Sequence, residues 1–420
     1  MTATLPMERV DGRDVIDFDH YSEHFRDHWR EMAVEFHADG HPIAWTERHG
    51  GSWVVADWAE AQRISKEWET FTSYNDLDGS GNGGKGQVVP QAAYPLLLGE
   101  SDPPLHTQRR RLEVPFFTPK ALRRWRPLVA RFLVEALNDV IERGEVELIE
   151  EVIVPTTART TLHILGYPGE WEGPAAVASK AMYLLPGDPG YPAAEQSSMR
   201  QGFREMLTER ARHPTGDIIS ALATGTVDDR PLSLDEGESM MNALVFGGFD
   251  TTVSATGSSL IWFDQHPDER ARACADTALM TNAVDELLRH FPPVSHQART
   301  AVRDTEVLGQ PIAAGERMLI WLGGVNYDPR HFPDPMTVDL ARPNARDHVS
   351  FSAGHHRCLG SPLAKIEIQH MLETIYAALP ELSIDHDGIE RYPNLGTVAG
   401  YMKIPATFRP GAPLELPELD

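Results

Sequence analysis

The chain has 420 residues, of which 41% are hydrophobic, so it can bury a large core as an ordinary globular enzyme does. Its formal net charge of −24 argues against a nucleic-acid partner, because phosphate binding needs a basic face. There is no run of about 18 apolar residues and no basic-then-apolar N-terminus, so we expect no membrane anchor and no secretion. No break in composition marks a linker, and we therefore predict one domain over residues 1–420.

Two cysteines, Cys274 and Cys358, allow at most one disulfide, which fits a reducing cytoplasm. Near the N-terminus, apolar spacing predicts an amphipathic helix from Tyr21 to Phe36. Residues 42–46 and 52–56 are two short apolar runs around a glycine pair and predict a small hairpin, after which Asp57 should cap a helix.

A glycine-rich segment at about residues 75–91 follows. It carries five glycines between Gly79 and Gly86 and few apolar residues, so it cannot form a core of its own. Long loops of this kind inside a domain are usually functional, and we predict a mobile lid here.

His106 and Arg110 lie four residues apart after two prolines, which places both on one face of a helix. They are either polar residues on a solvated surface or a clamp for an anionic group. The segment from His106 to Arg126 is strongly basic within an acidic chain. Most charged runs only face solvent, but this one could also bind an acidic electron-transfer protein, with Arg109, Arg123 and Arg124 as exposed contacts.

Helical patterns continue beyond residue 128, and helices at about residues 170–215 could form a movable roof over a pocket. The longest apolar helical stretch runs from Leu234 to Phe263. Gly247 and Gly248 lie at its middle, although glycine lowers helix stability by about 1 kcal/mol relative to alanine. They indicate either a packing groove or the close approach of a ligand. Asp250 and Thr251 follow directly and could relay protons to a bound group.

The segment from Phe351 to Gly360 presents Cys358 on a glycine-flanked loop just before a predicted helix, with Ser361 as N-cap and Pro362 in the first turn. The helix N-terminus and the neighbouring Arg357 favour a thiolate, which is the form of cysteine that binds metals. Cys274 has no such surroundings, and we interpret it as structural.

The Cys358 segment resembles the haem-binding loop of bacterial cytochrome P-450 monooxygenases, Phe-Gly-x-Gly-x-His-x-Cys-x-Gly, with Ser352 where many members have glycine. Asp102–Arg110 is similar to the family's Asp-Pro-Pro-x-His-x-x-x-Arg, and Gly247–Thr251 to its Ala/Gly-Gly-x-Asp/Glu-Thr. The motifs occur in the family's order. The resemblance implies a mainly α, P-450-like fold with a helix-rich region and a small β region.

The same resemblance implies the cofactor and the residues that bind it. Cys358 would be the axial ligand of the iron of heme b, and a thiolate ligand favours splitting of the oxygen–oxygen bond. The other predicted cofactor-binding residues are His106, Arg110, Arg299 and His356 at the propionates, and Gly247 and Gly248 on the distal helix.

Two further sets of roles follow from the resemblance. Asp250 and Thr251 would deliver protons during oxygen activation. Glu286 and Arg289 match the family's Glu-x-x-Arg, a buried structural pair that Arg342 would complete. Locally the match is weaker, because Val338 and Tyr327 occupy places that other members often give to phenylalanine and arginine.

The implied function is insertion of one atom of dioxygen into an apolar organic molecule, in the cytoplasm and as part of secondary metabolism. No flavin or nicotinamide motif is present, so electrons should come from NAD(P)H through a ferredoxin reductase and a ferredoxin. We expect a neutral, mid-sized substrate, with a terpenoid as the first choice over a large macrolide, because burying an unpaired ion is unfavourable. The predicted lining residues are Val88, Val89, Ala243, Leu244, Phe246, Val294 and Val398.

Two alternatives stay open at this point. A peroxide-driven hydroxylase would have little need of Asp250 and Thr251, since peroxide is already a reduced oxygen pair. A haem-based gas sensor without turnover would have little use for either the basic segment or the acid–hydroxyl pair.

Overall fold

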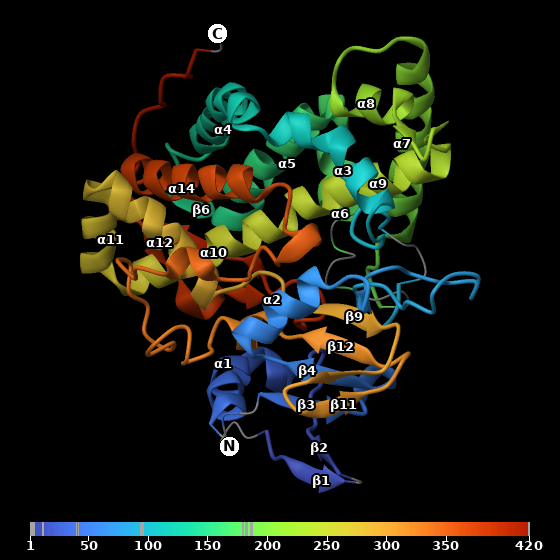
Figure 1. Cartoon of the computed structure of the whole chain (residues 1–420). Coiled ribbons are helices and arrows are strands. Elements are labelled where there is room, and N and C mark those ends of the chain that lie inside the picture. The colour runs from blue at the N-terminus through green and yellow to red at the C-terminus, as the bar shows by residue number, and fades with distance from the viewer. Residues whose placement is uncertain are drawn as a thin grey trace. The chain divides into compact units, whose positions relative to one another are not determined.

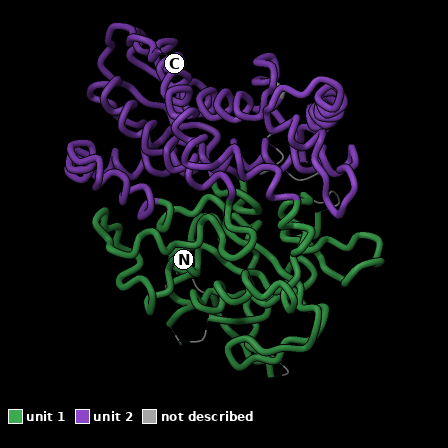
Figure 2. Tube along the Cα trace, turned by 45° about the horizontal axis from the view of Figure 1, so that its top comes forward, with its two compact units in different colours: residues 1–108, 288–358, 393–399 green, residues 109–287, 359–392, 400–420 purple. Residues whose placement is uncertain are grey.

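The computed structural model of the chain describes residues 5–10, 12–38, 40, 42–92, 96–178, 180, 184 and 188–418. The chain divides into two compact units (Figure 2). Unit 1 comprises residues 1–108, 288–358 and 393–399, and unit 2 comprises residues 109–287, 359–392 and 400–420. The single domain over residues 1–420 stays a prediction.

Unit 1 is built on a seven-stranded sheet with the strand order β1-β2-β3-β4-β12-β9-β5 (Figure 1). The antiparallel pairing of β3 with β4 confirms the predicted hairpin, and β12 pairs parallel to β4 and antiparallel to β9. The strands are β1 Glu8–Val10, β2 Arg13–Val15, β3 Ile43–Thr46, β4 Ser52–Val55, β5 Phe71–Thr72, β9 Gln297–Ala301 and β12 Arg317–Ile320. A separate hairpin joins β10 Thr305–Val307 to β11 Gln310–Ile312.

Both faces of this sheet are buried. Val54 and Leu319 belong to one hydrophobic cluster, while Val55 and Ile320, the next residues along the same strands, belong to another. Because successive side chains of a strand point to opposite faces, central strands covered on both sides must be apolar throughout.

Helices cover the two faces. Helix α1, Glu23–His37, packs Phe25 and other aromatic residues into the first cluster, and α2, Trp58–Lys66, packs Ile64 into the second. Ser22 and Asp57 cap these helices, so both predicted helix starts are confirmed to within two residues. The short helix α13, Leu322–Val325, follows β12.

Unit 2 is mainly helical. Its helices are α4 Pro119–Asn138, α5 Val154–Leu165, α6 Glu172–Ala178, α7 Ala193–Arg212, α8 Ile218–Thr224, α9 Leu234–Gly248, α10 Asp250–Gln265, α11 Pro267–Ala275 and α14 Ser361–Ala378. Its strands are β6 Glu145–Glu147, β13 Ser383–Ile384 and β16 Pro405–Thr407 in one sheet, with the pairs β7 Thr226–Val227 and β8 Arg230–Pro231, and β14 Glu390–Arg391 and β15 Tyr401–Lys403. Helices α3, Leu105–Glu113, and α12, Thr277–His290, contain residues of both units.

The predicted roof helices correspond to α6 and α7, and the segment between them lies partly outside the described residues. Their movement stays a prediction. Cys274 lies exposed on α11, so the interpretation of this cysteine as a structural residue is wrong.

The long helix expected over residues 234–263 is interrupted. Helix α9 ends at Gly248, α10 begins at Asp250, and Phe249 between them has φ −90° and ψ −84°, outside the helical range. Two consecutive glycines weaken the helix at this place, so the break falls where helix propensity is lowest. The sequence located the weak point but not the break itself.

Arg109 differs from its prediction. It was expected on an exposed basic surface, but it is 4% exposed, and its Nη2 donates to Glu236 Oε1 at 2.8 Å. Arg230 also binds Glu236, at 2.6 Å, and the Glu236 carboxylate accepts a hydrogen bond from the backbone of Ser233, the N-cap of α9. This cluster fixes the start of α9 to α3. The Arg230 bond is the largest of the interactions that hold the pKa of Glu236 well below its usual range.

We predict that Glu236→Gln lowers the free energy of unfolding by about 3 kcal/mol, because the Arg109 guanidinium stays buried without its carboxylate. Since the folded-state pKa of Glu236 is lowered, the stabilisation is present above the ordinary pKa of 4.5 and is lost as the pH falls further. Urea unfolding followed by circular dichroism measures both effects.

The matched control is Asp235→Asn, which removes the carboxylate of an exposed neighbour that pairs with Arg204. It should change the free energy of unfolding by less than about 0.5 kcal/mol. Equal effects of the two substitutions would contradict a special role for the buried pair.

Candidate functional site

The loop that carries Cys358 is held by its backbone. Cys358 N donates to Phe351 O at 2.8 Å and closes the loop, and the sulfur side chain is exposed. Gly354 has φ +65°, and a Cβ built there would lie 2.1 Å from the carbonyl oxygen of Ser65. Only glycine fits such a position, so α2 and the loop pack backbone to backbone.

Ser352, the departure from the family pattern, also has a left-handed backbone, with φ 59°. Its Oγ donates to Gln297 Oε1 at 2.5 Å, and this bond ties the loop to β9 and offsets part of the strain of a non-glycine residue. Helix α14 begins at Ser361 with Gly360 as N-cap and no side-chain cap, so the predicted N-cap role of Ser361 is wrong.

His106 and His356, which the sequence places 250 residues apart, lie together in unit 1 with ring centroids at 4.4 Å. His356 Nε2 lies 2.8 Å from Ser73 Oγ, and Ser73 in turn donates from both N and Oγ to Asp102 Oδ1 at 3.0 and 2.9 Å. Because the Ser73 hydroxyl proton is used on Asp102, His356 is the donor to Ser73. Asp102, which also accepts from Thr72 Oγ1, therefore orients the His356 ring.

Arg299 lies on β9, as predicted, and is 1% exposed. Its Nη1 donates to its neighbour Ala298 O at 2.7 Å, while its Nη2 has no hydrogen-bond partner among the described residues. Burial lowers the pKa of Arg299 to about 10, although the charge of Asp102 acts in the opposite direction. A buried guanidinium with an unused donor is suited to an anionic ligand.

Arg110 is half-buried in unit 2, and Glu113 follows three residues later on α3. Glu113 is completely buried, and neither carboxyl oxygen has a hydrogen-bond partner in the described structure. Burial raises the pKa of Glu113 to about 8, against the opposing charge of Arg110. The carboxyl is therefore mostly protonated at neutral pH and adds little negative charge beside Arg110.

Asp250 and Thr251, the residues predicted for catalysis, lie directly after the break between α9 and α10. A Cβ on Gly247 would meet nothing within 4 Å, whereas one on Gly248 would lie 2.6 Å from Thr161 Oγ1 on α5. Gly248 thus permits helix packing, and Gly247 leaves open space. Thr251 Oγ1 donates to Gly247 O at 2.9 Å across the break, and the neighbouring Asp250 is 4% exposed.

The predicted lining residues lie in both units. In unit 1, Val294 and Val398 form an isolated antiparallel bridge, and Val89 is buried in the hydrophobic cluster that covers one face of the sheet. In unit 2, Phe246 is buried, and Ala243 and Leu244 are partly exposed on α9. Val88 is half-buried. Their common role as a lining stays a prediction.

The segment predicted as a mobile lid has several anchors. Arg317 Nη2 lies within hydrogen-bond distance of the carbonyl oxygens of Lys85, Gly86 and Val88, and Glu100 Oε1 accepts from Gln87 N at 2.9 Å. Between these anchors and Asn75, which bridges to Lys85, the chain forms an exposed tip. Its mobility stays a prediction.

Arg289 and Arg342, the two predicted structural arginines, both bind the irregular segment of unit 1 that contains Thr337. Arg289 Nη2 and Arg342 Nη2 both donate to Thr337 O, at 3.2 and 2.9 Å, and Arg289 also donates to Asn326 O. Glu286 is completely buried on α12, one turn before Arg289. Two of the three residues are thus shown to act together, and their pairing with Glu286 stays a prediction.

In unit 1, Ser73 links His356 to Asp102, the His106 ring contacts the His356 ring, and the charge of Asp102 acts on Arg299. Arg110, Gly247, Asp250 and Thr251 belong to unit 2, and the meeting of the two sets at one cofactor stays a prediction. The part played by Asp102 and Ser73 was missed. The aspartate before the two prolines was visible in the sequence, but nothing local indicated that its carboxylate orients a histidine far along the chain.

Comparison with known proteins identifies the family. The family model named Cytochrome P450 matches residues 199–379. The chain is 32% identical over 292 residues to 6-deoxyerythronolide B hydroxylase of Saccharopolyspora erythraea, covering 69% of this chain and 72% of that protein. It is 30% identical over 373 residues to the monooxygenase PikC of Streptomyces venezuelae, covering 86% of each.

Among solved structures, CYP108D1 of Novosphingobium aromaticivorans matches with a TM-score of 0.80 and 26% identity, over 92% of this chain and 96% of that one. The chain belongs to the cytochrome P450 family. It has the family's mainly α fold with a small β region, and it is a monooxygenase of this family, as the sequence predicted. Within the described residues, every helix is too short or too polar to cross a membrane.

Family membership implies a haem cofactor, and the described residues fit it. Haem carries two propionates and needs an axial ligand. Arg299 has an unused, buried donor, His356 is held by Ser73, and Cys358 exposes its sulfur. We infer that Arg299 binds a propionate, because a carboxylate would satisfy Nη2 and offset the desolvation of the guanidinium.

We predict that Arg299→Leu weakens haem retention at least about tenfold, since a buried charge-assisted bond contributes roughly 1.5–3 kcal/mol. The rate of haem transfer to an excess of an acceptor protein measures the effect. Arg303→Leu, an identical exchange at an exposed position just after β9, should leave that rate unchanged. Similar rates for both variants would show that Arg299 does not bind the cofactor.

Proposed function

We propose that this P450 takes electrons from a ferredoxin, itself reduced by NAD(P)H through a ferredoxin reductase, and oxidises a mid-sized, largely neutral molecule of secondary metabolism. The observation that carries the proposal is an exposed cationic surface on a chain whose net charge is −24. A location in the bacterial cytoplasm, where Cys274 and Cys358 stay reduced, belongs to the same proposal.

The surface lies on α3, α4 and the turn between them, and we call it the α4 basic face. Its exposed cationic residues are Arg111, Lys120, Arg123, Arg124 and Arg126. Glu113, the acidic residue of this segment, is buried and mostly protonated at neutral pH, so it subtracts little from the positive charge. An acidic ferredoxin is the electron donor whose charge complements such a face.

The substrate class rests on the apolar character of the predicted lining and on the relatives. Two curated relatives are named for hydroxylation of 6-deoxyerythronolide B and of erythromycin at C-12. Terpenoid-like molecules stay the first choice predicted from the sequence, and the relatives add these lactones to the compounds to be screened. Charged analogues should bind more weakly, because no charged residue is among the predicted lining positions.

Different residues would bind the haem iron and the haem propionates. Haem, when bound through the Cys358 thiolate, supplies the oxygen-activating chemistry. Arg299, Arg110, His106 and His356 would hold its propionates.

At the helix break, the open space at Gly247 would admit oxygen beside the Thr251 hydroxyl. Asp250 would exchange protons with that hydroxyl through water.

We predict that Thr251→Ala keeps haem and substrate affinity but diverts most of the consumed reducing equivalents into hydrogen peroxide. The hydroxyl would hold the proton path and not the cofactor. Peroxide formed per NADH consumed should rise several-fold, and Thr251→Ser, which keeps a hydroxyl able to bind Gly247 O, should restore most of the coupling. Unchanged coupling in Thr251→Ala would exclude the relay.

We predict that Arg123→Glu lowers the second-order rate of reduction by ferredoxin about tenfold at low salt, because exposed charge acts mainly on the rate of encounter. The loss should fade at high ionic strength. Arg123 is a cleaner choice than Arg124, whose guanidinium also lies 4.7 Å from the Trp125 ring centroid. Stopped-flow reduction with a surrogate ferredoxin gives the rates.

The matched control is Arg212→Glu, the same exchange at an exposed position at the end of α7. Its reduction rate should fall by less than about twofold. Equal rates for the two variants at low salt would place the electron donor elsewhere, and product formation with a hit substrate would still test the oxidation itself.

A further inference from the structure

Four ring side chains meet inside unit 1. His20 lies with its ring centroid 4.2 Å from that of His296, 4.8 Å from that of His49 and 4.7 Å from that of Tyr21. His20 is 1% exposed and His296 is 5% exposed. The cluster brings the N-terminal segment, the turn after β3 and the start of β9 together.

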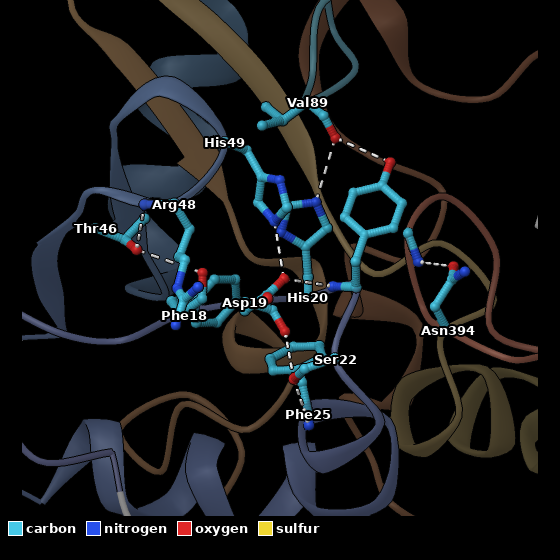
Figure 3. A network of polar contacts seen from close by, with 12 residues as sticks. Phe18, Asp19, His20, Ser22, Phe25, Thr46, Arg48, His49, Val89 and Asn394 are labelled. Atoms are coloured by element: carbon cyan, nitrogen blue, oxygen red, sulfur yellow. Dashed lines mark hydrogen bonds and ion pairs between the residues drawn. The ribbon is translucent and has the colours of Figure 1, made fainter. Parts of the chain in front are cut away.

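The first anchor joins this cluster to the segment of Val88 and Val89. His20 Nε2 lies 3.3 Å from Val89 O, and Tyr21 Oη donates to the same oxygen at 3.1 Å (Figure 3). A carbonyl oxygen only accepts, so His20 is the donor and its Nε2 carries the proton. Two side chains of the N-terminal segment therefore fix one carbonyl of the segment that was predicted to line the substrate.

The second anchor joins the cluster to the other two predicted lining segments. Ser295 Oγ donates to Leu395 O at 2.8 Å and lies 2.8 Å from His296 Nδ1, which must then donate to it. Tyr21 also packs so closely on Gly396 that a Cβ there would lie 2.2 Å from the Tyr21 ring. Leu395 and Gly396 lead directly to Val398, which bridges to Val294.

Burial disfavours the charged form of both rings. Burial lowers the pKa of His20 to about 4 and that of His296 well below its usual value, and the neighbouring histidines act in the same direction. His20 Nδ1 has no hydrogen-bond partner in the described part of the chain, so an added proton there would find no acceptor. The charged groups that act on the cluster are Asp19, which binds His49 at 2.8 Å, and Arg317.

We propose that His20 and Tyr21 are positioning residues of the substrate site, because they hold the three unit-1 segments that would face the substrate in one fixed arrangement. The inference rests on the proposed function, since only there are Val88, Val89, Val294 and Val398 assigned to the substrate. It adds residues from the N-terminal segment, which none of the family motifs includes.

The test compares two ligands of the haem iron in the full-length holoprotein at pH 7.5. Imidazole is small and would contact little beyond the iron, whereas clotrimazole is bulky and would also contact the surrounding segments. The variants are Tyr21→Phe, His20→Phe and their double. His24→Phe on the exposed side of α1 is the matched control, and His20→Gln retains a donor for Val89 O.

Each single variant should weaken clotrimazole about threefold, because the other donor still satisfies Val89 O. The double variant should weaken it more than tenfold, beyond the product of the two single effects, since a carbonyl without any partner is left near the core. Imidazole affinity should change less than twofold in every variant. His24→Phe should match the wild type, and His20→Gln should recover most of the loss.

Hydrogen exchange gives a second readout that does not depend on any ligand. The double variant should lose protection in residues 86–90 and 395–399, while β3 and β4 keep theirs. Unchanged clotrimazole affinity would overturn the proposal, whether or not exchange rises. Equal weakening of imidazole and clotrimazole would also overturn it, because the effect would then lie at the haem. If imidazole gave no spectral shift with the wild type, the proposed function itself would be wrong.

Discussion

The burial of the Arg299 guanidinium, which no carboxylate binds by a hydrogen bond among the described contacts, is the constraint on which the site in unit 1 depends. Strand β9 places Arg299 inside the unit. The carboxylate of Asp102, whose charge acts on Arg299, already accepts hydrogen bonds from Ser73 and Thr72. The pKa of Arg299 is lowered, so its charge is held at a free-energy cost. An anion would stabilise such a guanidinium, and we propose that a haem propionate supplies it. In this proposal the cofactor would stabilise unit 1 as well as supply the oxidising chemistry.

A second constraint acts on the distal helix. Glu236 fixes the start of α9 through Arg109 and Arg230, while the glycine pair lets the helix break about three turns later. The fixed start of α9 and the break at its glycine pair have different roles. A fixed helix start would keep the register of Ala243, Leu244 and Phe246. Across the break, Gly247 O accepts a hydrogen bond from the Thr251 hydroxyl. Gly248 is required by Thr161 on α5, so only one of the two glycines leaves room for a ligand.

The sequence predicted those features whose signals lie within a few residues. The hairpin of β3 and β4, the amphipathic helix near the N-terminus, the cap at Asp57 and the Cys358 loop are of this kind. The burial of Arg109 could not be predicted, because its partner Glu236 lies 127 residues away and the surrounding run looks uniformly basic. The family motifs carried the fold and the class of enzyme. They say nothing about Asp102 as the group that orients His356.

The N-terminal cluster shows how such long-range contacts extend a site beyond its motifs. His20 and Tyr21 precede α1, a helix that packs on the sheet, so their sequence context gives only packing signals. Their partners are a carbonyl at Val89 and a glycine at position 396, neither of which has a recognisable side-chain chemistry. Many different side chains can donate to a backbone carbonyl or pack on a glycine, so such contacts leave no fixed pattern in the sequence. If the cluster sets where the lining segments lie, substrate preference can change through residues that never touch the substrate, while the residues that bind haem stay the same.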